Sequence, residues 1–148
     1  MNSFQAKAQV GINKSVVDVF SAIVNYEQMT NYFISSASAN MTEGATITWT
    51  WSDVNAEGTV YVETIIPNSK IVFYWPATSP NRKVELSFQE LENGGTKVSA
   101  VESGDWGLNI ASIEAACQQT GGWMHMLLCL KAYLEHGINL RKGSVIMG

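Results

Sequence analysis

Residues 82–102 read RKVELSFQELENGGTKVSAVE, and this stretch is the best guide to the fold of the chain. Apolar and polar residues alternate on both sides of Asn93-Gly94-Gly95, and a two-residue period is typical of strands that bury one face. Asn and Gly tolerate positive φ angles, so the central residues favour a tight hairpin turn. The pattern therefore predicts two antiparallel strands, at residues 82–90 and 96–102, with this turn between them.

The two-residue period also occurs in the first half of the chain. It predicts strands at residues 45–51, 59–66 and 70–75, which are separated by short turns. An N-terminal strand is expected at residues 4–12, where every second residue is apolar. Because five consecutive strands have short connections, they favour an antiparallel meander.

Helical periodicity follows the N-terminal strand. Ser15 is a suitable N-cap, and Asp18 can support the free amides of the first helical turn. Asn25 is expected to end this helix. A second short helix is predicted at residues 26–32, and the Ser-rich segment 33–43 is expected to be a connection.

A long helix is predicted near the C-terminal end of the sequence. Asn109 is a suitable N-cap, apolar residues recur at helical spacing from Ile110, and Gly137 is a suitable stop. Gly121-Gly122 lies midway and weakens the helix by roughly 1 kcal/mol per glycine, so we expect a kink or a close neighbour there. Residues 138–148 are expected to form a tail.

Length and composition narrow the classes of function. The 148 residues fit one domain, which we expect to span residues 1–148. The formal net charge is −4, and the nine basic residues form no run. Nucleic-acid binding needs a positive stripe, and docking on anionic lipid needs a basic surface, so composition argues against both partners.

The two cysteines give an expectation about the compartment. Cys117 and Cys129 both fall in the predicted long helix, about 18 Å apart along its axis, which is too far for a disulfide between them. The first ten residues contain no apolar leader, and no stretch approaches 18 consecutive apolar residues. We therefore expect reduced thiols, no membrane span and a cytoplasmic location.

Four segments together resemble the SRPBCC (START/Bet v 1-like) superfamily, and within it the branch named after the activator of Hsp90 ATPase. They are residues 12–23; Glu57-Gly58-Thr59-Val60 through residues 66–75; Gly94-Gly95-Thr96-Lys97-Val98; and Gly122-Trp123 with the helix up to Gly137. The resemblance covers nearly the whole chain. It implies an α+β helix-grip fold, with about six strands in the order β-α-α-β-β-β-β-β-α wrapped around the C-terminal helix.

The sequence departs from the superfamily pattern at two places. The Trp-Phe pair usual after the second helix is Tyr32-Phe33 here, and the His often found on the last strand is replaced by Glu102. Both positions fall near the expected pocket, so the ligand preferences of relatives do not transfer. The fold does not imply an activity either, because the superfamily contains lipid carriers, polyketide cyclases, hydrolases and co-chaperones.

A ligand pocket is predicted between the sheet and the long helix. Alternate side chains of each strand share one face, so the aromatic and aliphatic residues of the meander should gather on its concave side. Such a wall suits an apolar or aromatic ligand. The alternative is that the same residues simply form the core. The predicted ligand-binding residues are Trp49, Trp51, Val62, Phe73, Trp75, Leu86 and Glu102 from the strands, and Ile113, Cys117 and Met124 from the helix.

Glu102 is the charged residue of most interest. It lies on the same strand face as Val98 and Ala100, so its carboxylate is a candidate ligand anchor or acid–base group, unless it sits in water at the end of the strand. The sequence contains no metal-ligand spacing, phosphate-binding glycine loop or other cofactor motif.

We favour a protein that binds or carries a small hydrophobic or aromatic molecule, with no cofactor. The first alternative is an enzyme of the cyclase, dehydratase or hydrolase kind that uses Glu102 as its acid–base group. The second is a co-chaperone-like interaction module. Low surface charge and Thr-rich strands also predict a homodimer.

Overall fold

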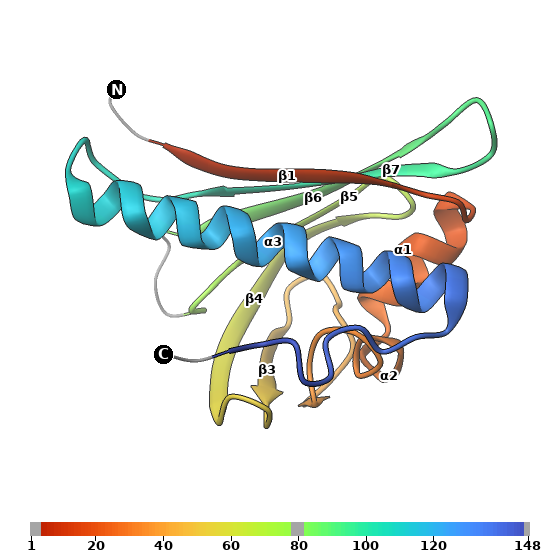
Figure 1. Ribbon diagram of the computed structural model, residues 1–148, viewed down its shortest axis with the longest axis horizontal. Helices are drawn as coiled ribbons and strands as arrows, with labels where there is room; N and C mark the ends of the chain where they lie inside the picture. The colour runs from red at the N-terminus through yellow and green to blue at the C-terminus, as the bar shows by residue number, and fades with distance from the viewer. Residues whose placement is uncertain (1–3, 78–81, 147–148) are drawn as a thin grey trace.

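The computed structural model describes residues 4–77 and 82–146. A curved antiparallel sheet has the strand order β1-β7-β6-β5-β4-β3-β2, and the long helix α3 crosses one face of it (Figure 1). The elements are β1 (Gln5–Ile12), α1 (Val16–Val24), α2 (Tyr26–Met29), β2 (Ser36–Ala37), β3 (Thr46–Trp51), β4 (Ala56–Ile66), β5 (Lys70–Tyr74), β6 (Lys83–Glu90), β7 (Thr96–Ser103) and α3 (Ile110–His136).

This arrangement is the predicted α+β helix-grip fold. The sheet has seven strands instead of about six, because the two-residue strand β2 pairs with β3 inside the segment expected to be a connection. The second helix also ends earlier than predicted, at Met29. β2 contains one Ser and one Ala, which is too short a stretch to show a periodic pattern. It is recognised as a strand only by its pairing with Thr50 and Trp49 of β3.

The sheet buries the face that the alternation predicts. Leu86 of β6 lies between Ala100 of β7 and Ile71 of β5, and all three side chains are buried. Along β7 every second residue is buried, which places Glu102 on the inner face. A register shift in β4 between Val62 and Thr64 marks a bulge, which bends and twists the strand locally.

The predicted caps of α1 and α3 are confirmed by their contacts. Ser15 Oγ accepts a hydrogen bond from Asp18 N at 3.2 Å, and Asn109 Oδ1 accepts one from Ser112 N at 2.9 Å. Gly137 follows α3 with φ 64°, the left-handed conformation that glycine adopts without strain. The sequence signals at these three positions therefore set where the helices begin and end.

Helix α3 packs chiefly on β1, the edge strand at the other end of the sheet from β2. Its buried residues are Ala116, Trp123, Met126, Leu127, Cys129 and Leu130. The helix continues through Gly121 and Gly122, as Figure 1 shows. A Cβ built on either glycine would meet no described atom within 4 Å, so the close neighbour expected there is not found.

The predicted tail folds back on the domain. Residues 138–146, here termed the C-terminal strap, turn at the end of α3 and run past α2 and β3 (Figure 1). Arg141 Nε lies 2.9 Å from Asp53 Oδ2 in the turn between β3 and β4. Ser144 Oγ lies 2.9 Å from His125 Nε2 on α3. In the described part of the chain, no helix is both long and apolar enough to cross a membrane.

Candidate functional site

Six aromatic rings meet between the sheet and α3. They are Phe33, Trp49, Trp51, Phe73, Trp75 and Trp123, with contacting ring centroids 5.5–6.5 Å apart. Most pairs are edge-to-face or tilted, which are the favourable arrangements of aromatic rings. These contacts fix the ring planes, so the cluster forms a rigid apolar wall.

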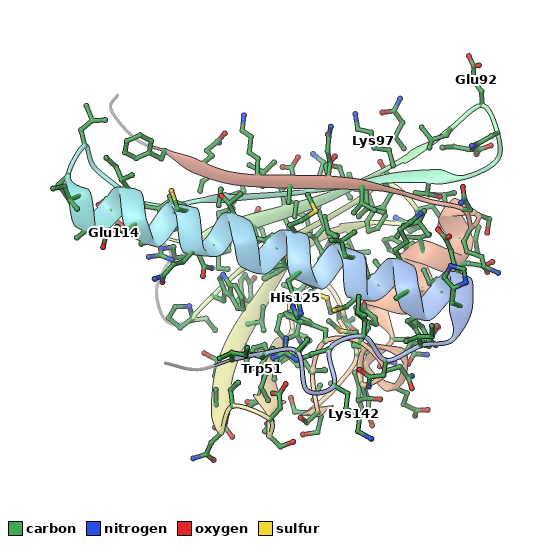
Figure 2. The ribbon with its side chains drawn as sticks, viewed as in Figure 1. Trp51, Glu92, Lys97, Glu114, His125 and Lys142 are labelled. Carbon is green, nitrogen blue, oxygen red and sulfur yellow. The ribbon has the colours of Figure 1, made fainter. Side chains whose placement is uncertain are left out.

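A cavity of about 390 Å³ lies against this wall. Its lining residues are Phe33, Trp51, Val54, Trp75, Gln119, Gly122, Trp123, His125, Arg141, Ser144 and Val145. The sheet side supplies Trp51 and Trp75, α3 supplies Trp123, and the strap supplies the opposite wall. In Figure 2 the labelled side chains Trp51 and His125 lie near one another beside the strap. The volume is within the range of small-molecule sites, roughly 300–1,000 Å³.

A second cavity of about 620 Å³ is also lined by Trp51 and Trp75. Gln119 lines both cavities, together with the two tryptophans. The second cavity is more polar, because Glu57, Asp105 and Arg82 contribute to its lining.

Glu102 lies beneath the aromatic wall and is completely buried. Its Oε1 accepts hydrogen bonds from Gln119 Nε2 at 2.7 Å and from Trp123 Nε1 at 2.8 Å. Its Oε2 accepts from Trp75 Nε1 at 3.2 Å and pairs with Arg82 at 3.4 Å. Both oxygens act as acceptors, which is the role of an ionised carboxylate. One carboxylate thus orients two indoles and one amide of the cavity wall.

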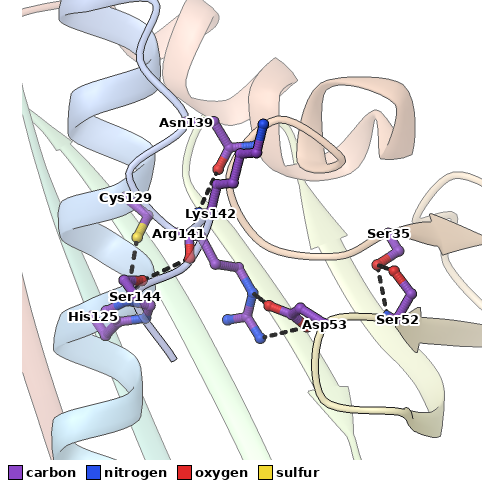
Figure 3. A network of polar contacts seen from close by, with 9 residues as sticks. All are labelled: Ser35, Ser52, Asp53, His125, Cys129, Asn139, Arg141, Lys142 and Ser144. Atoms are coloured by element: carbon purple, nitrogen blue, oxygen red, sulfur yellow. Dashed lines mark hydrogen bonds and ion pairs between the residues drawn. The ribbon is translucent and has the colours of Figure 1, made fainter. Parts of the chain in front are cut away.

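The strap side of the cavity is polar and internally paired (Figure 3). Ser144 Oγ contacts His125 Nε2 and also donates to the Arg141 carbonyl oxygen at 2.7 Å. The Arg141 guanidinium binds both carboxylate oxygens of Asp53, at 2.9 and 3.4 Å. Burial lowers the pKa of His125, and Arg141 lowers it further while Asp53 opposes the shift. The neutral imidazole is therefore favoured at this contact.

Comparison with known proteins identifies the family of the chain. Residues 13–135 match the family described as "Activator of Hsp90 ATPase homolog 1-like protein". The chain belongs to this family. No curated protein matches the chain.

Several solved structures have the same fold as this chain. A Staphylococcus saprophyticus protein is 30% identical, with a TM-score of 0.81, and the match covers 93% of this chain and 96% of that one. The Aha1 protein of Colwellia psychrerythraea, solved as a dimer, is 20% identical over 90% and 98% of the two chains, with a TM-score of 0.76. DynU16, from the dynemicin biosynthetic locus, is 21% identical over 90% and 48%, with a TM-score of 0.79.

The structure places eight of the ten predicted site residues in three groups. Trp51 and Trp75 line the cavity, and Glu102 lies directly behind it. Trp49, Val62, Phe73 and Leu86 are at most 2% exposed and belong to the buried core on the inner face of the sheet. Met124 is half-buried and lines a different cavity beside β1 and β7.

Ile113 and Cys117 require a correction, because they are exposed instead of facing the sheet. The inner face of α3 passes through Ala116, Trp123 and Leu127. At 3.6 residues per turn, Ile113 and Cys117 lie roughly 60° to 100° around the helix axis from that face. The prediction therefore had the correct helical period, but it placed the first part of the buried face at the wrong angle around the helix axis.

Several cavity residues were not predicted. Trp123 belongs to a segment that resembles the family, and Phe33 belongs to the Tyr32-Phe33 pair that was expected near the pocket, so a signal existed for both. Gln119 and His125 lie on α3 but fall outside the predicted apolar face. The residues of the strap show no period, and only the fold brings them onto the cavity.

Proposed function

We propose that this protein binds a small apolar or aromatic molecule in the cavity between the aromatic wall and the C-terminal strap. The observation that carries the proposal is a cavity of about 390 Å³ faced by Trp51, Trp75 and Trp123. A flat ring system placed there can contact three indoles at once. Aromatic pairs contribute about 0.5–1.5 kcal/mol each beyond the burial of their surface, so this wall favours aromatic over aliphatic ligands.

Glu102 favours binding over acid–base catalysis. The carboxylate has no exposed surface, and protein donors occupy both oxygens. A general acid or base must come within hydrogen-bond reach of the reacting proton. A substrate would have to displace an indole or an amide of the wall to reach this group. We therefore propose that Glu102 holds the wall in shape and that the site binds its ligand without changing it.

Binding can be tested with 2-methylnaphthalene as a neutral probe, followed by quenching of tryptophan fluorescence and by the melting temperature. The matched variants are Gly122→Leu, at a glycine that lines the cavity, and Gly121→Leu, at its neighbour that does not. Both sites have room for a Cβ, and Leu favours the helix over Gly, so both variants should fold.

We expect the wild type and Gly121→Leu to bind the probe with similar affinity. Gly122→Leu should bind at least tenfold more weakly, because its side chain occupies the cavity. Equal loss in both variants, or no saturable binding by the wild type, would contradict the proposed site.

A homodimer stays a prediction for this chain. The dimer of the Colwellia psychrerythraea protein supports it, as do the weakly charged, Thr-rich strands. Light scattering on the protein eluting from a gel-filtration column measures the mass directly, and a mass of one chain at high protein concentration would reject it.

A further inference from the structure

The side-chain amide of Gln119 has a fixed orientation in the cavity wall. An ionised carboxylate can only accept hydrogen bonds, so the group that faces Glu102 Oε1 at 2.7 Å must be the NH₂ end of the amide. Trp123, one turn further along α3, donates to the same oxygen at 2.8 Å. Rotating the amide would bring two acceptor oxygens together. Glu102 therefore determines which end of Gln119 remains for a ligand.

The end that remains is the carbonyl oxygen, Gln119 Oε1. No described residue donates a hydrogen bond to it. It is also not fully enclosed, because the buried side-chain polar atoms without a partner in the described ranges are Trp49 Nε1 and Trp106 Nε1. Gln119 lines the cavity beside Trp51 and Trp75. Gln119 also lines the second, more polar cavity, and Trp51 and Trp75 line both cavities, so the unoccupied acceptor belongs to a residue beside these two tryptophans.

The polar groups of the opposite wall already have partners within the protein. Ser144 and His125 contact one another, and Arg141 is paired with Asp53. These contacts hold the strap in place, and a ligand would have to break them to bind there. The unoccupied acceptor of Gln119 requires no such displacement.

We propose that the ligand is an aromatic molecule with a hydrogen-bond donor, such as a phenolic hydroxyl or a ring N–H, and that Gln119 Oε1 accepts this hydrogen bond. This inference rests on the proposed function and adds to it the chemical class of the ligand. A ring without a donor would cover the carbonyl oxygen and remove its water without replacing the hydrogen bond, which costs affinity.

The test compares two probes of nearly equal size, 2-naphthol and 2-methylnaphthalene, on the wild-type protein. A purely apolar pocket prefers the methyl compound, because the hydroxyl loses its water on entry. A pocket with an accessible acceptor compensates for that loss. We expect 2-naphthol to bind about fivefold more tightly than 2-methylnaphthalene, the size of effect expected from one net hydrogen bond.

The preference should depend on Gln119 alone. Gln119→Met has nearly the same length and shape but no acceptor, and we expect the ratio of the 2-naphthol affinity to the 2-methylnaphthalene affinity to fall to one or below. This ratio is the readout, because the variant also removes the Gln119 hydrogen bond to Glu102 and can change both affinities together. Gln118→Met is the matched control, because Gln118 is exposed on the same helix and does not line the cavity. It should keep the wild-type preference.

The outcomes separate this inference from the proposed function. If the wild type binds both probes but prefers 2-methylnaphthalene, or if Gln119→Met keeps the preference for 2-naphthol, the inference fails and the cavity remains a binding site. If neither probe saturates the wild type, the proposed function fails and the inference fails with it. The wild-type comparison of the two probes decides the matter even if Gln119→Met does not fold.

Discussion

At the scale of single residues, Glu102 is the most constrained group in the fold. A buried carboxylate is tolerated when donors and an opposite charge replace its water, and here Trp75, Arg82, Gln119 and Trp123 do so. Arg82 also lies over the Trp106 ring, 4.4 Å from its centroid. These contacts connect Glu102, near the end of β7, to the residue that follows β5 and to α3. Through Arg82 they also connect it to the loop before α3.

Removing this carboxylate should destabilise the protein strongly. Glu102→Ala leaves two indole N–H groups and an amide without their acceptor, and each buried donor left without a partner costs about 1–3 kcal/mol. Urea unfolding measures the change. Glu114→Ala is the control, since Glu114 is exposed on α3 and should change stability by less than about 0.5 kcal/mol. Similar losses in the two variants would mean that the Glu102 network contributes little.

The lowered pKa of His125 predicts that the stability of the protein depends on pH. Burial is the largest cause of its lowered pKa in the folded protein, compared with an ordinary value of 6.5. As the pH falls through 6.5, the unfolded chain takes up the proton first, so the free energy of unfolding decreases until the folded protein is protonated as well. The loss lies below pH 6.5 and is absent above it.

The measurement is the melting temperature between pH 7.5 and pH 5.5. His125→Gln should lose less stability over this range than the wild type, because glutamine does not titrate. His136→Gln is the control, at a histidine whose side chain is 66% exposed. If His125→Gln loses as much stability as the wild type over this range, the pH dependence comes from other groups.

At the scale of elements, the position of the C-terminal strap predicts that it controls access to the cavity. Arg141, Ser144 and Val145 form one wall, and an ion pair and a hydrogen bond hold that wall against the body of the protein. The end of α3 does not need the strap, because Gly137 N and Ile138 N already bond to carbonyls of its last turn. The strap can therefore be removed after Ile138 without uncapping the helix.

Truncation after Ile138 should leave a folded protein with an open cavity. We expect association and dissociation of the 2-methylnaphthalene probe to become faster, with dissociation accelerated more because one wall is lost. Stopped-flow fluorescence measures both rates. Arg141→Gln, which loosens the strap without removing it, should lie between the wild type and the truncated protein. Unchanged rates in the truncated protein would show that the ligand enters elsewhere.

The elements also show why the sequence predicts the fold better than the site. Strong local signals specified β7, the hairpin turn and the caps Ser15, Asn109 and Gly137, because alternation and capping depend on neighbouring residues. Trp51 and Trp75 were predicted at the cavity because they continue inward-facing strand patterns. The positions of the strap and β2, and the angle of α3 around its axis, depend on contacts between distant segments. The local sequence contains no periodic pattern that predicts such contacts.

At the scale of the whole molecule, the cavity follows from where the helix packs. Because α3 lies chiefly on β1 at one edge of the sheet, β3 and β4 at the other side are left without a helix over them. Large aromatic side chains and the strap fill part of this space, and the cavity is what they leave. The sheet is therefore covered by a helix at β1, and by aromatic side chains and the strap at β3 and β4.

This asymmetry predicts where a ligand protects backbone amides from hydrogen exchange. Without ligand, exchange should be slowest in β5, β6 and β7, whose inner side chains are fully buried and whose strands are paired on both sides. The C-terminal strap and the turn around Asp53 should exchange fastest, since an ion pair and a few hydrogen bonds hold them.

Adding saturating 2-methylnaphthalene should slow exchange in the strap, in the turn around Asp53 and in α3 near Trp123. The hairpin between β6 and β7 should not respond, because Glu92 and Lys97 lie on the other side of α3 from Trp51 in the view of Figure 2. Mass spectrometry of peptides from exchanged protein resolves these regions. Protection of the β6–β7 hairpin without protection of the strap would place the ligand away from the aromatic wall, because a ligand orders first the segments that it touches.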